Sequence, residues 1–389
     1  MASQSKQQSE TNSPVIAMRG AGYYSANTVG AKAVIDAAAD LVLEALESMP
    51  LKGATPFTIA DYGAADGGTS IDMMRKAIAR IRKDAPERQI AITYTDLPHN
   101  DFSVLFQLLQ GLLPAYKENP LALQPNVFTF GSGMSFYRQI FPDQTVSLGF
   151  SATAMHWLSK LPLQIADHPH AVGANPEEKK ELRKAALADW DTILLHRARE
   201  MVPGGKFVFA NFCEDEKGHY LGNTGGVNMH DTFAKHWRNL LRDGTITEAE
   251  YKRANFVQFY KTKEEFVAPF NDRDSAVSKA GLVLEKAFTR TTGCPYAADF
   301  KQKGDAAAFA KSYVPTLRSW SESTFMGGLD PSRPQQERMA IINRFYDSYE
   351  AEVAASPEGH AMDYVHCFMV VSKKPEAGAG PDRRGGSAV

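Results

Sequence analysis

The chain has 389 residues, of which 43% are hydrophobic, and its formal net charge is −2. This length suits two average domains or one large α/β domain with insertions, and the apolar content is ample for a buried core. The near-neutral charge gives no reason to expect nucleic acid or an anionic membrane as a partner, because both attract a basic excess.

Cysteine spacing and terminal composition narrow the class further. The three cysteines, Cys213, Cys294 and Cys367, lie far apart, which favours neither a disulfide framework nor a zinc site, so a reducing, cytosolic compartment is expected. Residues 1–13 and 374–389 are poor in bulky apolar side chains and are expected to be disordered. No segment approaches the roughly 20 apolar residues of a membrane span, and no signal region is visible, so we expect a soluble, unprocessed protein.

Hydrophobic periodicity predicts alternating helices and strands along the first half of the chain. In chain order the predicted elements are helix 29–46, strand 57–61, helix 69–83, strand 90–96, helix 102–113, strands 127–131 and 145–150, helix 177–201 and strand 206–212. Such alternation is typical of a parallel, doubly wound α/β sheet. Residues 214–335 change to helices and loops rich in aromatics, before a late strand within 363–374. We therefore expect a sheet domain over 14–213 and 336–373, with 214–335 inserted as a helical cap.

A glycine-rich turn, DYGAADGGTS (61–70), follows the first predicted strand. Ligands of open α/β sheets bind at such strand ends. A dinucleotide fingerprint needs G-x-G-x-x-G and an acid about 20 residues later, whereas here Asp61 precedes the glycines and Asp96 lies 35 residues beyond it. A carboxylate repels a pyrophosphate but attracts an amino group or a sulfonium, so the turn suits S-adenosylmethionine (SAM) better. Asp96 would then accept the ribose hydroxyls, and a purely structural turn is the alternative.

Five motifs in a fixed order decide between these interpretations. They are MRGAGYYSANT (18–28), DYGAADGGTS (61–70), TDLPHNDFS (95–103), SFYRQIFP (135–142) and SATAMHWLSKLP (151–162). Together they resemble the salicylate, benzoate and theobromine methyltransferase family, usually called SABATH, over about residues 15–373. The resemblance implies SAM-dependent methylation of small carboxylic acids, or of ring nitrogens in one branch. It also implies a Rossmann-like class I methyltransferase sheet with a largely helical cap over the acceptor pocket.

The matched positions imply two sets of site residues. The cofactor-binding set is Thr28, Asp61, Gly63, Thr69, Asp96, Leu97, Ser135 and Phe136. The acceptor-binding set is Ala31, Thr153, His156, Trp157, Phe259 and Trp320. In the family, the His-Trp pair helps hold the substrate carboxylate. Because a carboxylic acid is already ionised at pH 7, we expect catalysis by positioning, with no general base and no metal.

Two acceptor-site positions depart from the family pattern. Ala31 stands where the family has Gln, with Lys32 as a neighbouring candidate, and Thr153 replaces a pocket Tyr. The loss of a donor and an aromatic wall favours small aliphatic mono- or dicarboxylic acids over flat aromatic ones. Arg19, Lys32 and Arg318 are candidate partners for a second carboxylate, the alternative being ordinary surface charges.

Several alternatives stay open from the sequence. An N-methyltransferase of the same family, a nicotinamide-dependent oxidoreductase and a binding-only relative are the other functions considered, and the Asp61–Asp96 spacing weighs against the oxidoreductase. The stretch DHPH (167–170) has two histidines without an evident third ligand and is interpreted as a solvated loop. The quaternary structure considered for this chain is a homodimer.

Overall fold

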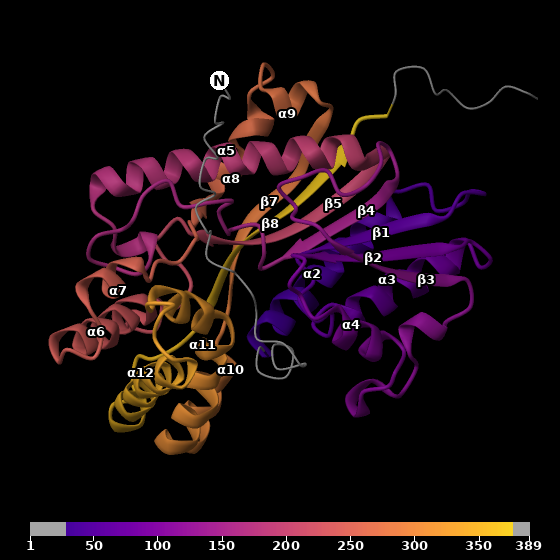
Figure 1. The fold of residues 1–389 in the computed structure, drawn as a ribbon. Coiled ribbons are helices and arrows are strands. Elements are labelled where there is room, and N and C mark those ends of the chain that lie inside the picture. Colours follow the sequence, from indigo (N-terminus) through magenta and orange to yellow (C-terminus); the bar gives the residue numbers. More distant parts are fainter. Residues whose placement is uncertain (1–28, 376–389) are drawn as a thin grey trace, which may run out of the picture.

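The computed structural model describes residues 29–375, so the expectations for 1–13, Arg19 and Thr28, and nearly all of those for 374–389, lie outside the described residues. Its centre is a sheet with strand order β3-β2-β1-β4-β5-β8-β7 (Figure 1). The strands are β1 (Phe57–Tyr62), β2 (Ile90–Asp96), β3 (Val127–Gly133), β4 (Val146–Ala152), β5 (Met201–Glu214), β7 (Leu282–Thr292) and β8 (Tyr364–Lys373), with the short β6 (Lys261–Thr262) paired to β5. Strands β1 to β5 are parallel, and β8 runs antiparallel to both β5 and β7. The predicted α/β class is confirmed.

Helices cover both faces of the sheet (Figure 1). One face carries α2 (Val29–Glu47), α3 (Ile71–Asp84) and α4 (Phe102–Leu109), and the other carries α5 (Pro176–Glu200), α8 (Lys263–Asn271) and α9 (Ala276–Lys279). Along β5, Val208 and Ala210 face the first layer while Phe207 and Phe209 face the second. A strand buried on both faces has no polar alternation, which explains its continuous apolar sequence.

The remaining helices gather at one end of the sheet (Figure 1). They are α6 (Met229–Arg242), α7 (Glu248–Arg253), α10 (Pro295–Lys303), α11 (Ala306–Gly328) and α12 (Gln335–Ala355). Elsewhere, the described residues include the short 3-10 helices η1 (Pro114–Tyr116), η2 (Leu121–Leu123) and η3 (Ala171–Gly173). The structure differs from the helical cap expected for 214–335, since β7 within that range is a strand of the main sheet. As an edge strand it is half exposed and carries Glu285, Lys286 and Arg290, so its sequence lacks an apolar run.

Local signals account for the well-predicted helices. In α5, Asn175 and Glu178 form a reciprocal capping box with Pro176 in the first turn, so the helix begins where the sequence places it. Thr262 and Glu265 form a second capping box at α8. Within residues 29–375, no helix combines the length and apolar character needed to cross a membrane.

Candidate active site

The turn after β1 folds back onto the end of β2. The backbone N–H groups of Gly63 and Ala64 both donate to the carbonyl of Thr95, at 2.9 and 3.0 Å. Gly63 has a φ of +79°, and a Cβ placed there would lie 2.4 Å from the Cβ of Ala154 and 3.9 Å from the ring of Phe136. Only glycine fits at this position. The turn, the segment after β4 and the loop carrying Phe136 therefore meet at the carboxyl edge of the sheet.

Asp61 lies at the centre of this edge and is 3% exposed. Its Oδ2 accepts a hydrogen bond from the Ser70 hydroxyl at 2.6 Å. Burial is the main influence and raises the pKa of the Asp61 carboxyl to about 7, with nearby Asp96 acting in the same direction and the Ser70 bond opposing it. A buried carboxyl so close to neutrality is poised to ionise when a cationic group arrives beside it. Thr69 is also buried, and it lines a pocket together with Asp61.

Asp96 ends β2 with its side chain partly buried and held by the backbone. Its Oδ2 accepts the N–H of Ala65 and its Oδ1 accepts the N–H of Leu97, both at 2.7 Å. Burial raises the pKa of Asp96, and the two N–H groups oppose that shift. Each carboxylate oxygen keeps a further lone pair, so the oriented group can accept two neighbouring hydroxyls.

A pocket lies between the ends of β1 and β4. It is lined by Ile35, Asp61, Gly63, Ala64, Ala65, Thr69, Ser70, Phe150, Ala152 and Thr153. Thr153 has a φ of +53°, which is uncommon for a β-branched residue, and its N–H donates to the carbonyl of Ala210 at 2.8 Å. Such backbone strain is of order 1–3 kcal/mol and is found mostly at functional sites. The pocket thus places the Asp61 carboxyl beside the glycine turn at this edge of the sheet.

The loop 135–141 closes the site on one side. The Phe136 ring is half buried, lies 4.8 Å from the ring of Tyr137 and approaches Gly63 as described above. The Ser135 hydroxyl accepts the N–H of Tyr137 at 3.4 Å. The Tyr137 hydroxyl donates to the carbonyl of Trp157. The predicted pair Ser135–Phe136 thus connects the glycine turn with the segment that carries the predicted acceptor residues.

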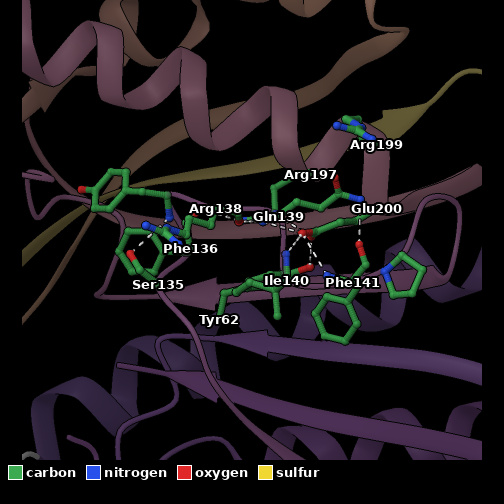
Figure 2. A network of polar contacts seen from close by, with 12 residues as sticks. Tyr62, Ser135, Phe136, Arg138, Gln139, Ile140, Phe141, Arg197, Arg199 and Glu200 are labelled. Atoms are coloured by element: carbon green, nitrogen blue, oxygen red, sulfur yellow. Dashed lines mark hydrogen bonds and ion pairs between the residues drawn. The ribbon is translucent and has the colours of Figure 1, made fainter. Parts of the chain in front are cut away.

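A buried ion pair supports this loop, and no signal in the sequence indicates it (Figure 2). Arg197 and Glu200, in the last turn of α5, are 1% and 0% exposed, and Nε and Nη2 of Arg197 each donate to the carboxylate at 2.7 Å. Arg197 also donates to the carbonyls of Phe136 and Arg138, both at 2.9 Å. The Tyr62 hydroxyl donates to Glu200 at 2.6 Å. The pair has the residue types of an ordinary exposed helix end, so only the tertiary structure shows its role.

His156 and Trp157 follow β4 and pair with a cap segment. Leu158 N–H donates to the carbonyl of Val257 at 2.8 Å, and Phe259 N–H donates to the carbonyl of His156 at 3.2 Å. Trp157 is 8% exposed and shares a small apolar cluster with the half-buried Phe259. Burial holds the pKa of His156 well below its usual range, so the ring is neutral.

The other acceptor-site candidates are distributed more widely. Ala31 packs in the core on α2, and Trp320 on α11 lies 6.4 Å from the ring of His230. Lys32 is paired with two carboxylates, those of Asp36 and Asp72, at 3.0 and 2.9 Å. The guanidinium of Arg318 pairs with Glu322 and donates to Asn343. Both of these candidate cations are thus already neutralised.

The interpretation of residues 167–170 as a solvated loop is wrong. His168 is 9% exposed and His170 is 0% exposed, and the His170 ring stacks on that of His230 at 4.1 Å. The cause is tertiary, because His230 comes from α6 of the cap, about 60 residues later. Over residues 29–375 no group of three or more His, Cys, Asp or Glu side chains is arranged to hold a metal ion.

Comparisons with known proteins agree with this geometry. The sequence profile of a family described as SAM dependent carboxyl methyltransferase matches residues 14–374. Indole-3-acetate O-methyltransferase 1 of Arabidopsis thaliana is 25% identical over 301 residues, which cover 72% of this chain and 75% of the relative. Loganic acid O-methyltransferase of Catharanthus roseus is 28% identical over 273 residues, which cover 64% and 70%.

A solved structure gives the same fold. Loganic acid methyltransferase with S-adenosylhomocysteine (SAH) matches with a TM-score of 0.71 at 20% identity, over 92% of this chain and 99% of that chain. The predictions of SAM as methyl donor and of carboxyl methylation are confirmed by the family match, and neither the N-methyltransferase nor the oxidoreductase alternative is supported. The chain belongs to the family of SAM-dependent carboxyl methyltransferases.

Proposed function

We propose that this enzyme forms the methyl ester of a small aliphatic carboxylic acid, at the junction between the sheet edge and the cap. The observation that carries the proposal is that Asp61 and Asp96 lie at the carboxyl ends of β1 and β2, and the His156–Trp157 segment follows the neighbouring parallel strand β4, so all of them lie along one edge. The paired states of Lys32 and Arg318 give no support to a second carboxylate on the acceptor.

The chain's own residues would hold the cofactor from three sides. Asp61 faces the amino group of the methionyl part, with Gly63 and Thr69 in the adjoining turn, while Asp96 accepts the ribose hydroxyls and Leu97, Ser135 and Phe136 border the adenine. When bound, SAM would supply a methyl group attached to its sulfonium. The acceptor oxygen would bond to this methyl carbon as the C–S bond breaks, which leaves SAH and the ester.

The acceptor side works by position. A carboxylate needs no base at pH 7, so His156 and Trp157 only have to hold it in line and exclude water. Alignment of this kind is worth up to roughly 7–11 kcal/mol in intramolecular reactions. Because burial keeps His156 neutral, its role is that of a hydrogen-bonding group and not of a counter-ion.

Compartment and assembly complete the proposal. The three cysteines are free and buried, which is compatible with the cytosol as a reducing compartment. The proposed assembly is a homodimer, and light scattering of the purified chain would measure its mass.

The function is tested by calorimetry and by an ester assay. We expect SAH to bind more tightly than NAD, and small aliphatic acids to yield methyl esters faster than salicylate or xanthines yield methylated products. Trp157→Ala should lower kcat/KM at least tenfold, or about 1.4 kcal/mol of transition-state positioning. Phe128→Ala, an aromatic on β3 that is 47% exposed, is the matched control. Tighter NAD binding, or an indifferent Trp157→Ala variant, would contradict the proposal.

A further inference from the structure

Five polar side chains are buried together where the cap meets the sheet edge. We call them the histidine–tyrosine cluster: His156, His170, His230, Gln258 and Tyr260, none of which is more than 5% exposed. His156 follows β4, His170 precedes η3, His230 lies on α6, and Gln258 and Tyr260 precede β6. The cluster therefore continues from the predicted carboxylate-binding residue into the cap.

Tyr260 is the centre of the cluster. Its ring lies 4.7 Å from that of His170, 5.9 Å from that of His230 and 6.1 Å from that of His156. Its hydroxyl donates to Oε1 of Gln258 at 3.4 Å and lies 3.2 Å from Nε2 of His230. Three histidines from distant parts of the sequence thus pack around the ring of Tyr260.

Three imidazole nitrogens of the cluster are unsatisfied. Nδ1 of His156, Nε2 of His170 and Nδ1 of His230 are fully buried and have no hydrogen-bond partner among residues 29–375. A buried polar atom without a partner costs free energy that a phenyl ring of similar size would not. A pure packing role does not account for the choice of histidine, whereas a ligand that supplies the missing bonds does.

The hydrogen-bond pattern indicates which group is missing. Nε2 of His230 and the Tyr260 hydroxyl share one hydrogen bond in which either can be the donor, so Nδ1 of this neutral ring is an acceptor in one tautomer and a donor in the other. A hydroxyl group can bond to Nδ1 of His230 or of His156 in either tautomer, because it both donates and accepts, whereas a carboxylate can only accept.

The charges around the cluster argue against a second carboxylate. Burial lowers the pKa of His156, His170 and His230, so the rings carry no charge near neutral pH. The buried Lys261 lies 5.1 Å over the Phe266 ring and its charge is offset by Asp189 and Glu265. A second carboxylate buried here, away from the sulfonium that would face the first, would have no cation beside it and would be strongly disfavoured.

We propose that the acceptor is a hydroxylated aliphatic acid, whose carboxylate lies at His156 and Trp157 and whose hydroxyl forms a hydrogen bond with Nδ1 of His230. This inference rests on the proposed function of the same site. It assigns His230 and Tyr260 to substrate specificity.

The test compares acids of equal length. Octanoic acid, octanoic acids with one hydroxyl at successive carbons, and octanedioic acid are assayed for ester formation and are titrated into the SAH-loaded protein. At least one hydroxy acid should exceed octanoic acid at least tenfold in both kcat/KM and affinity, and octanedioic acid should be the poorest ligand. In His230→Phe the hydroxyl preference should fall to about threefold or less, and SAH binding measured in the same titration shows that the variant is folded. Tyr260→Phe, which keeps the ring, should lower the preference in part.

The control is His236→Phe, because His236 lies on the same helix but is satisfied by Glu352 at 2.9 Å. The hydroxyl preference should persist in this variant. A preference for octanoic or octanedioic acid, or a hydroxyl preference that survives in His230→Phe, overturns the inference. If SAH binds but no acid binds or reacts, the proposed function itself fails, and the two failures are thereby distinguished.

Discussion

The two halves of the site satisfy their polar atoms in opposite ways. At the cofactor edge, the backbone orients the carboxylate of Asp96, and Asp61 is bonded to Ser70. In the histidine–tyrosine cluster, three buried nitrogens have no partner in the described part of the chain. The chain thus builds the cofactor edge in advance and leaves the acceptor side incomplete for its ligand to finish.

The largest expected effect is on the support of loop 135–141. Arg197→Met leaves the Glu200 carboxylate buried without its cation, which should lower the free energy of unfolding by about 3–5 kcal/mol. Adding Glu200→Gln should recover at least half of the loss, since the glutamine is uncharged. Urea unfolding measures both. The neighbouring Arg199 is 60% exposed and pairs with Asp143 at 3.2 Å, so Arg199→Met should change stability by less than about 1 kcal/mol.

Next comes the affinity for the cofactor. Asp96→Ala should weaken SAH binding by about 2–4 kcal/mol, because two charge-assisted hydrogen bonds to the ribose are lost and partly replaced by water. Titration calorimetry gives the dissociation constant directly. Asp84→Ala, which removes a surface carboxylate paired with Arg80, is the control and should bind as the unmodified chain does. An unaltered constant in Asp96→Ala would place the ribose elsewhere.

The pKa of Asp61 predicts that the affinity for SAH changes about tenfold with pH. Its carboxyl has a pKa of about 7 in the folded protein, and an incoming ammonium group binds the ionised form. SAH affinity should therefore be full well above pH 7 and about tenfold weaker at pH 6 than at pH 8. In the absence of ligand, the raised pKa of Asp61 has the opposite effect on folding. The free energy of unfolding falls as the pH rises toward 7, because the buried carboxyl must then ionise. In Asp61→Asn the pH dependence of binding should disappear; its persistence would assign the titration to another group.

The smallest effect is expected in the cluster. Because Nδ1 of His230 is unsatisfied, His230→Phe should change the free energy of unfolding by less than about 1 kcal/mol despite full burial. His236→Phe removes a satisfied histidine and leaves Glu352 with one partner fewer, so it should cost about 1–3 kcal/mol. Urea unfolding of the two variants compares them directly. A larger loss in His230→Phe than in His236→Phe would mean that the cluster is a completed core.

The parallel strands and their helices could be predicted from sequence because their signals are local. Strand β2 coincides with the predicted 90–96, and α5 begins within one residue of the prediction, since a capping box and proline define its start. β7 was missed because an edge strand with charged side chains has no apolar run. The DHPH histidines were misjudged because the helix that buries them lies far along the chain.

The sequence by itself determined the doubly wound sheet, the glycine turn with Asp61 and Asp96, and the family. Each depends on short-range patterns: strand and helix periods, one positive-φ glycine, and motifs in a fixed order. Only the tertiary structure decided that Arg197 and Glu200 support the loop 135–141 and that His156, His170 and His230 meet around Tyr260. The physical reason is that burial and hydrogen-bond satisfaction depend on which distant segments pack together, and a side chain's charge state and free partners follow from that packing.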